Sequence, residues 1–271
     1  MHQRPSRSNW PYCDSTYPDA FSGEKDSCGV GFIANVEGKP NNWVLSQALR
    51  GLSCMEHRGG CGGDSDSGDG AGILCEIPWS YLKKVWITAE QCEPKSSGIG
   101  MIFMPQDTQN RELAIKICEQ EAESLGLTSK GWRDVPVNEE VLGKLARENE
   151  PFITQWIVNI SDKEINLEAL LFRLRQRISN RANLELKEDK LGLYICSLSS
   201  KTIVYKGMVR SEILAPFYQD LKDERFEVSY AVYHRRFSTN TLPKWPLAQP
   251  MRLLGHNGEI NTLLGNINWA K

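Results

Sequence analysis

The sequence lacks several features that would assign it to a familiar class at once. It contains no run of 18 consecutive apolar residues, and residues 1–27 include no apolar stretch of the kind that follows the basic start of a signal peptide. A formal charge of −2 leaves no basic field for neutralising phosphates. We therefore expect no membrane span, no secretion by this route and no nucleic-acid partner.

Paired cysteines are also missing. The eight cysteines, at positions 13, 28, 54, 61, 75, 92, 118 and 196, form no C-x-x-C pair. Zinc and iron–sulfur sites ordinarily use that spacing, so no metal site is predicted. Most of these cysteines are expected to be small, buried hydrophobes with reduced thiols.

What is present is an ordinary globular composition of 271 residues, 40% apolar and 24% charged. Apolar residues at helical spacing predict helices in 43–55, 112–125 and 166–182. Apolar runs predict strands in 28–36, 73–78, 99–104, 193–198 and 202–208. Strands in adjacent pairs and helices in separate blocks favour an α+β fold with antiparallel sheets.

The glycine-rich segment 59–72 invites three interpretations. It has no lysine, which a phosphate-binding loop requires. An EF-hand loop starting at Asp64 would have Cys75 where a bidentate glutamate is needed, so calcium binding is not expected. The remaining interpretation is conformational: glycines permit positive φ, and short Asp and Ser side chains bond the local backbone.

Cys28 stands where a polar leader, residues 1–27, meets an apolar strand. If the Ser27–Cys28 bond were cut, one residue would carry a thiol and an α-amine whose ordinary pKa is about 7.7–8.0. Such an amine could act as the base for its own thiol, as in N-terminal nucleophiles. On position alone, a buried structural cysteine remains the stronger interpretation.

Residues 233–269 supply a second constellation. Arg236 offers a planar fork of donors suited to a carboxylate. Asn257 offers a side-chain amide beside the open backbone N–H of Gly258, and such donors can form an oxyanion hole. Alone, H-N-G is more often a turn and the arginine more often a structural ion pair.

Together these segments resemble the glutaminase domain of the glutamate synthase large chain, a class II glutamine amidotransferase of the N-terminal nucleophile hydrolase superfamily. The resemblance rests on ordered blocks that span residues 28 to 271. The blocks are CGVGFIAN, CMEHRGG, DSDSGDGAGI, SLSSKTIVYKGM, RFSTNT, WPLAQP and HNGEINTLLGN.

The resemblance implies that residues 1–27 are a propeptide removed by attack of the Cys28 thiol on the preceding carbonyl. Cys28 then becomes the nucleophile that forms a thioester with glutamine. Arg236 corresponds to the residue that holds the glutamine α-carboxylate, with Thr239 nearby. Asn257 and the Gly258 N–H correspond to the oxyanion hole.

Arg58 and Gly59 correspond to a supporting segment beside the nucleophile. Arg235 departs from the resemblance, because the family usually has Gln at this position. We expect it to alter only the rim of the site.

The implied fold is an αββα four-layer sandwich, with residues 28–271 forming a partial amidotransferase domain that is incomplete at its C-terminus. The residue that holds the glutamine α-amino group would lie beyond Lys271. We therefore expect a fragment with marginal folding and weak or no turnover.

No cofactor is expected in this segment, whereas FMN and an iron–sulfur cluster are implied for the full-length enzyme. The implied partners are L-glutamine, the remaining synthase domains, and either ferredoxin or a small NADPH-oxidising subunit. The implied location is bacterial cytoplasm or plastid stroma.

Two alternatives remain open. One is another class II amidotransferase, from asparagine or purine biosynthesis, although GDGAG and WPLAQP argue against it. The other is a non-catalytic remnant that keeps the fold without turnover.

Overall fold

The computed structural model describes residues 29–56, 59, 64, 66–162, 164–186, 192–236 and 242–252. Its strands form two four-stranded sheets, and within each sheet the neighbouring strands are antiparallel. The strands are β1 (Gly29–Ala34), β2 (Ala71–Glu76), β3 (Ser97–Met104), β4 (Thr128–Asp134), β5 (Phe152–Asn159), β6 (Tyr194–Ser199), β7 (Thr202–Gly207) and β8 (Tyr230–Arg235). The predicted α+β class with antiparallel sheets is confirmed.

The first sheet has the order β1-β8-β2-β7 and the second the order β4-β5-β3-β6. The edge strands β6 and β7 follow one another in the chain and contact each other, so they join the two sheets. The helices are α2 (Asn42–Cys54), α3 (Trp79–Val85), α4 (Ile87–Glu90), α5 (Thr108–Ser124), α6 (Lys144–Glu148), α7 (Leu167–Glu185) and α8 (Leu214–Phe217). Short 3₁₀ segments are also present, including η6 (Gln219–Lys222), between α8 and β8, and η7 (Trp245–Leu247), after β8.

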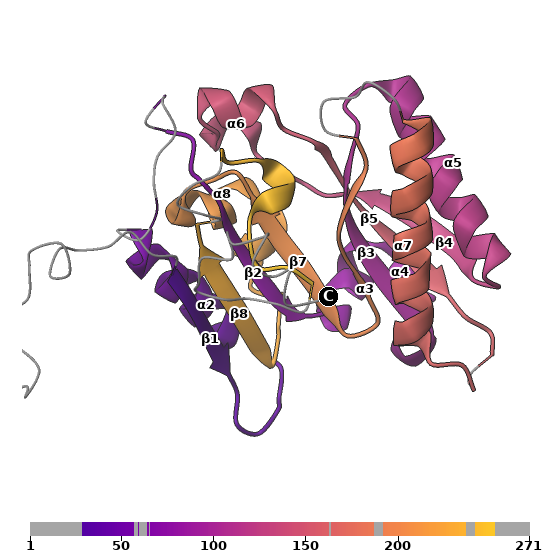
Figure 1. Ribbon diagram of the computed structural model, residues 1–271. Helices are drawn as coiled ribbons and strands as arrows, with labels where there is room; N and C mark the ends of the chain where they lie inside the picture. The colour runs from indigo at the N-terminus through magenta and orange to yellow at the C-terminus, as the bar shows by residue number, and fades with distance from the viewer. Residues whose placement is uncertain are drawn as a thin grey trace, which may run out of the picture.

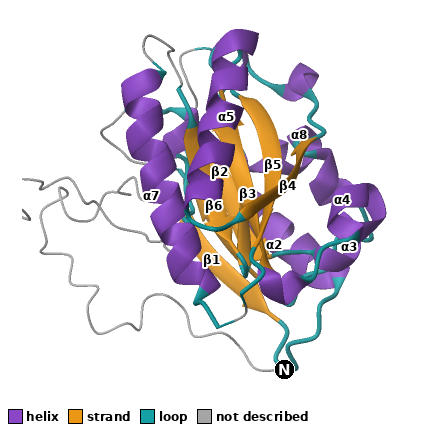
Figure 2. Ribbon diagram, turned by 90° about the vertical axis from the view of Figure 1, so that its right-hand side faces the viewer, coloured by secondary structure: helices purple, strands orange, loops and turns teal. Residues whose placement is uncertain are grey.

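Helices cover the outer faces of both sheets. Helix α2 packs on β1 and β8, while α5 and α7 lie side by side over the second sheet (Figures 1 and 2). One apolar cluster fills the space between the sheets and beneath α2, and a second lies between the second sheet and α5 and α7. This order of layers agrees with the predicted helix–sheet–sheet–helix sandwich.

The long helices begin at side-chain caps. The side chain of Asn41 accepts the backbone N–H of Val44, and Asn166 accepts that of Ala169, which satisfies donors left open at a helix start. In α2 the buried residues Val44, Leu45, Ala48 and Leu52 follow the spacing from which the helix was predicted.

A buried polar network ties the two sheets together. Asp220 of η6 is fully buried and accepts two hydrogen bonds from Arg133 of β4, at 2.7 and 2.9 Å. It also accepts the hydroxyls of Tyr81 and Tyr205, at 2.8 and 2.9 Å. Gln155 of β5 completes the network by accepting from Arg133 and donating to Tyr205. Because each partner is bonded, the buried charges are compensated.

Candidate active site

The register between β1 and β8 brings two distant segments together. Gly29, the residue after Cys28, pairs with Arg235, the residue before Arg236. Arg235 also pairs with Ala71 on its other side. The segments that carry two predicted site residues therefore run side by side at this end of the first sheet (Figure 1).

Arg236 has an unusual backbone conformation. Its φ is 77°, in the left-handed region that a residue with a side chain seldom adopts. The conformation is held by its backbone N–H, which donates to the carbonyl of Gly70 at 2.7 Å. Its Nε lies 2.9 Å from Oδ2 of Asp69, and the residue is only 8% exposed. The predicted carboxylate-binding arginine is thus fixed at both backbone and side chain.

Arg235 is fully buried, so the expectation that it lies on the rim of the site is wrong. Its guanidinium forms an ion pair with the other oxygen of Asp69 and donates to the carbonyl of Gly70 at 3.0 Å. A second arm lies 3.2 Å from Glu56, whose other oxygen accepts the backbone N–H of Ser211 at 3.0 Å. Burial was not foreseen because the two acidic partners come from segments remote in sequence.

Gly59 packs directly against this arginine. A Cβ placed on Gly59 would lie 1.9 Å from Cζ of Arg235. Similarly, a Cβ on Gly29 would lie 2.6 Å from Sδ of Met55. Glycine is required at residue 59 because the guanidinium occupies the space of a side chain. This contact with Arg235 accounts for a glycine at residue 59, and the supporting role beside the nucleophile stays a prediction.

Five predicted site residues lie outside the described part of the chain. They are Cys28, Arg58, Thr239, Asn257 and Gly258.

The glycine-rich segment uses its short side chains as predicted, to bond the backbone. Asp64 accepts the N–H groups of Asp66 and Ser67 and, across the chain, that of Leu145. The Ser67 hydroxyl accepts the N–H of Ala146, so the segment caps the start of α6. The hydrogen bond from Leu145 is the main reason that the pKa of Asp64 lies well below its ordinary value.

The segment 242–252 is held in place by Lys206 of β7. This lysine is fully buried, and its Nζ donates to the carbonyl of Pro246 at 2.7 Å and to the Tyr194 hydroxyl at 3.2 Å. Burial lowers the pKa of Lys206 to about 8. Trp245 adds a hydrogen bond from its indole N–H to the carbonyl of Ala146 at 3.0 Å.

Three described cysteines are structural. Cys75, Cys118 and Cys196 are buried, and burial raises the pKa of each thiol, to about 12 for Cys196. A high pKa disfavours the thiolate, so these residues are poor nucleophiles.

Within the described ranges, no three His, Cys, Asp or Glu residues cluster so as to hold a metal ion. No described helix is both long and apolar enough to cross a membrane.

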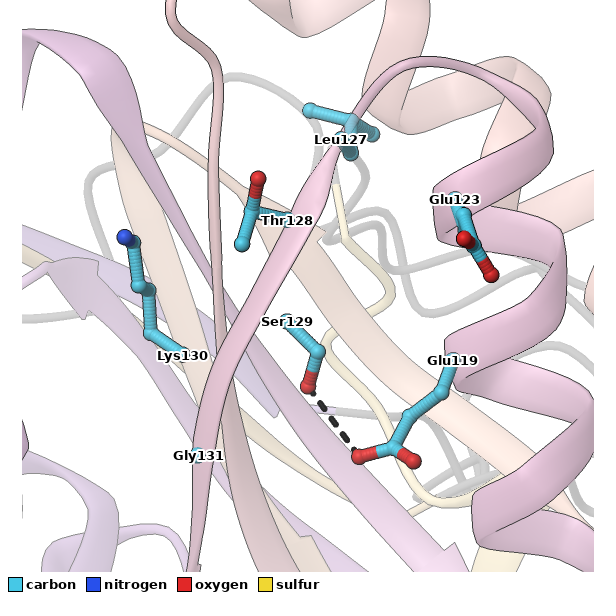
Figure 3. A pocket seen from close by; sticks show the side chains of 7 residues that line it. All are labelled: Glu119, Glu123, Leu127, Thr128, Ser129, Lys130 and Gly131. Carbon is cyan, nitrogen blue, oxygen red and sulfur yellow. Dashed lines mark hydrogen bonds between the residues drawn. The ribbon is translucent and has the colours of Figure 1, made fainter.

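A cleft of 480 Å³ lies between α5 and β4, at the edge of the second sheet (Figure 3). Its polar lining includes Glu119, Ser129 and Lys130. The Glu119 carboxylate accepts the Ser129 hydroxyl at 3.2 Å and the Trp132 indole N–H at 2.9 Å. These hydrogen bonds attach α5 to the edge strand β4. The polar side chain of Glu119 in the cleft therefore has a structural role.

The two-sheet architecture agrees with the family comparison. Residues 28–271 match the family described as class II glutamine amidotransferases. The chain belongs to that family of enzymes, as its sequence motifs predicted.

The particular relatives are ferredoxin-dependent glutamate synthases. The chain is 53% identical over 250 residues to ferredoxin-dependent glutamate synthase 2 of Synechocystis sp. and 50% identical over 253 residues to the chloroplastic/mitochondrial ferredoxin-dependent glutamate synthase 1 of Arabidopsis thaliana. The alignments cover 91% and 92% of the chain but 16% and 15% of the relatives. The chain thus spans about a sixth of the length of these curated relatives.

Sequence reasoning missed Glu56 and Asp69 as neighbours of the site. Both stand inside blocks on which the resemblance was based, CMEHRGG and DSDSGDGAGI. The only signal was their acidic character within blocks that carry the resemblance. The pairing with Arg235 and Arg236 follows only from the strand register.

Proposed function

We propose that this chain is the glutaminase module of a ferredoxin-dependent glutamate synthase, hydrolysing L-glutamine to glutamate and ammonia. One observation carries the proposal: Arg236 is held by Asp69 and Gly70 beside the strand that follows directly on Cys28. A fixed guanidinium beside this strand is suited to a substrate with a carboxylate.

In the proposed reaction, residues 1–27 are removed and residues 28–271 form the amidotransferase unit. The Cys28 amine takes the proton of its own thiol, directly or through water. The sulfur then bonds to the side-chain amide carbon of glutamine while Asn257 and the Gly258 N–H stabilise the oxyanion. The carbon–nitrogen bond breaks, the proton leaves with ammonia, and water hydrolyses the γ-glutamyl thioester to glutamate and the free thiol.

Substrate binding depends on Arg236, which holds the α-carboxylate, with Thr239 beside it. Arg58 and Gly59 support the nucleophile, Gly59 by leaving space for the guanidinium of Arg235. These roles require correct orientation more than strong binding, because a small displacement of the reacting carbon lowers the rate.

In the proposed setting the ammonia is passed to other parts of a longer synthase, where it aminates 2-oxoglutarate. FMN and an iron–sulfur cluster belong to those parts, with ferredoxin as electron donor, and no step at Cys28 uses them. The proposed location is bacterial cytoplasm or plastid stroma.

The test is to express residues 1–271, measure the intact mass, and incubate the chain with a diazo-ketone analogue of L-glutamine. We expect loss of residues 1–27 and a single adduct at Cys28. Cys28→Ala should abolish both events. Cys54→Ala, which changes an exposed cysteine, should abolish neither.

Folding is verified separately by circular dichroism. A folded chain with an unprocessed mass and no adduct would replace the proposal with a non-catalytic remnant. Persistence of either event in Cys28→Ala would show that another residue is the nucleophile.

A further inference from the structure

The carboxylate of Asp69 is shared between two adjacent arginines. One oxygen pairs with Arg235, and the other lies 2.9 Å from Nε of Arg236. The side chain of Asp69 is 13% exposed, so it is largely removed from water. Electrostatic interactions are stronger in such surroundings than at an exposed site.

The ion pair with Asp69 is a constraint on the position of the Arg236 guanidinium, because it limits how far the group can move from the carboxylate. The backbone of Arg236 is held as well, by its N–H bond to Gly70, the residue after Asp69. One short segment therefore holds both the backbone and the guanidinium of Arg236.

The charges of the cluster indicate what the second arginine contributes. Asp69 alone would neutralise Arg236 and weaken its attraction for an anion. Arg235, fully buried and fixed on Asp69 and Glu56, supplies the compensating positive charge. The two arginines balance Asp69 and Glu56 in formal charge, but the Glu56 side chain is 33% exposed and water partly screens its charge, so Arg235 offsets part of the charge of Asp69.

We propose that Asp69 and Arg235 are positioning residues for substrate recognition: Asp69 orients the Arg236 guanidinium toward the glutamine α-carboxylate, and Arg235 offsets the charge of Asp69. This inference rests on the proposed function, because it assigns the carboxylate to Arg236. It predicts that both residues affect recognition of the α-carboxylate and leave the Cys28 thiol itself unchanged.

The experiment compares two electrophiles on the 271-residue chain. The diazo-ketone analogue of glutamine carries the α-carboxylate, whereas iodoacetamide does not, and modification at Cys28 is followed by peptide mass spectrometry. Asp69→Asn keeps the shape of the side chain but turns one acceptor into a donor that faces an arginine. We expect the half-saturating concentration of the analogue to rise by about tenfold, because the Arg236 guanidinium loses its ion pair with Asp69. The iodoacetamide rate and the maximal analogue rate should stay within about twofold, since an orientation defect acts on binding.

Two further variants separate orientation from simple charge balance. Arg235→Gln introduces the residue that the family usually has here and leaves Asp69 paired with Arg236 alone, so we expect a smaller rise in the half-saturating concentration than in Asp69→Asn. The double variant Asp69→Asn with Arg235→Gln removes one charge of each sign, which guards against unfolding caused by an uncompensated buried charge. Asp66→Asn, an exposed residue of the same segment, is the matched control and should behave as wild type.

If the double variant binds the analogue as well as wild type, Asp69 serves only to neutralise Arg235, and the inference is wrong. An unchanged half-saturating concentration in Asp69→Asn would overturn it as well. The proposed function has a separate failure: wild-type Cys28 would react with iodoacetamide without any saturable reaction with the analogue. That result would remove the assigned substrate and with it this inference.

Discussion

Single residues around Arg235 have very little freedom to change. The buried guanidinium is enclosed by Asp69, Glu56 and the backbone of Gly70, and Gly59 lies on it without a side chain. A protein interior of this density transmits a small steric change to every partner of the displaced group.

Gly59→Ala tests this directly. The new Cβ would lie 1.9 Å from Cζ of Arg235, so the guanidinium must move and its ion pairs must lengthen. We expect a loss of about 1–3 kcal/mol in the free energy of unfolding, measured by urea denaturation, together with slower labelling of Cys28 by the glutamine analogue. Gly38→Ala is the control, because its site is open and only its φ of 68° is unfavourable. It should cost about 1 kcal/mol and leave labelling unchanged. Equal labelling of both variants would contradict the steric role of Gly59.

Glu150 gives a pH-dependent prediction. Burial, with a smaller contribution from Glu139, raises the pKa of this carboxyl to about 7 from an ordinary 4.5. Between these values the unfolded chain has lost the proton and the folded chain still holds it, so stability falls as pH rises through this window. Glu150→Gln should remove this slope and be more stable than wild type at pH 8 by roughly 2 kcal/mol. Thermal or urea unfolding across pH 4 to 8 measures it, and parallel curves for the two proteins would contradict the assignment.

At the scale of elements, the network around Asp220 fastens the two sheets and η6 to one another. Arg133 and Gln155 come from the second sheet and Tyr205 from the first. Burial of these groups is tolerated only because each is paired, so the network fixes how the sheets meet.

Asp220→Ala should therefore be strongly destabilising. It leaves the Arg133 guanidinium, whose side chain is 11% exposed, without its carboxylate. We expect a loss of about 3–5 kcal/mol, read from urea denaturation. The control is Asp223→Ala, three residues on, which removes an ion pair with the exposed Arg225 and should cost less than about 1 kcal/mol. Similar losses in the two variants would mean that the network contributes little.

The sequence predicted the elements whose own residues determine their conformation. Helix α2 has a regular apolar spacing, and the apolar runs of β1 and β7 identify both strands. Strands β4, β5 and β8 were missed. Strand β4 lies at a sheet edge and contains Lys130 and the bulge-forming Gly131, which are uncommon in strands. Strand β5 buries the polar Gln155, whose side chain is satisfied by hydrogen bonds with Arg133 and Tyr205.

The residues of the candidate site are likewise of two kinds: some are identified by local motifs, and others only by the fold. Arg236 and Gly59 could be selected from their motifs, because those motifs are local. Asp69 could not be separated from Asp64 and Asp66 by composition, since the three lie in one acidic, glycine-rich segment. Only the pairing of Ala71 with Arg235 places Asp69 at the two arginines while Asp64 caps α6.

At the scale of the whole molecule, the first sheet pairs the first described strand, β1, with the last, β8. Strand β1 pairs with β8, made roughly 200 residues later, whereas all four strands of the second sheet exist once β6 has been synthesised. At a translation rate of about 5–20 residues per second, β1 waits about ten to forty seconds on the ribosome for its partner. The segment that follows Cys28 is therefore among the first to emerge and among the last to pair. Assembly of the candidate site is thereby postponed until β8 has been translated.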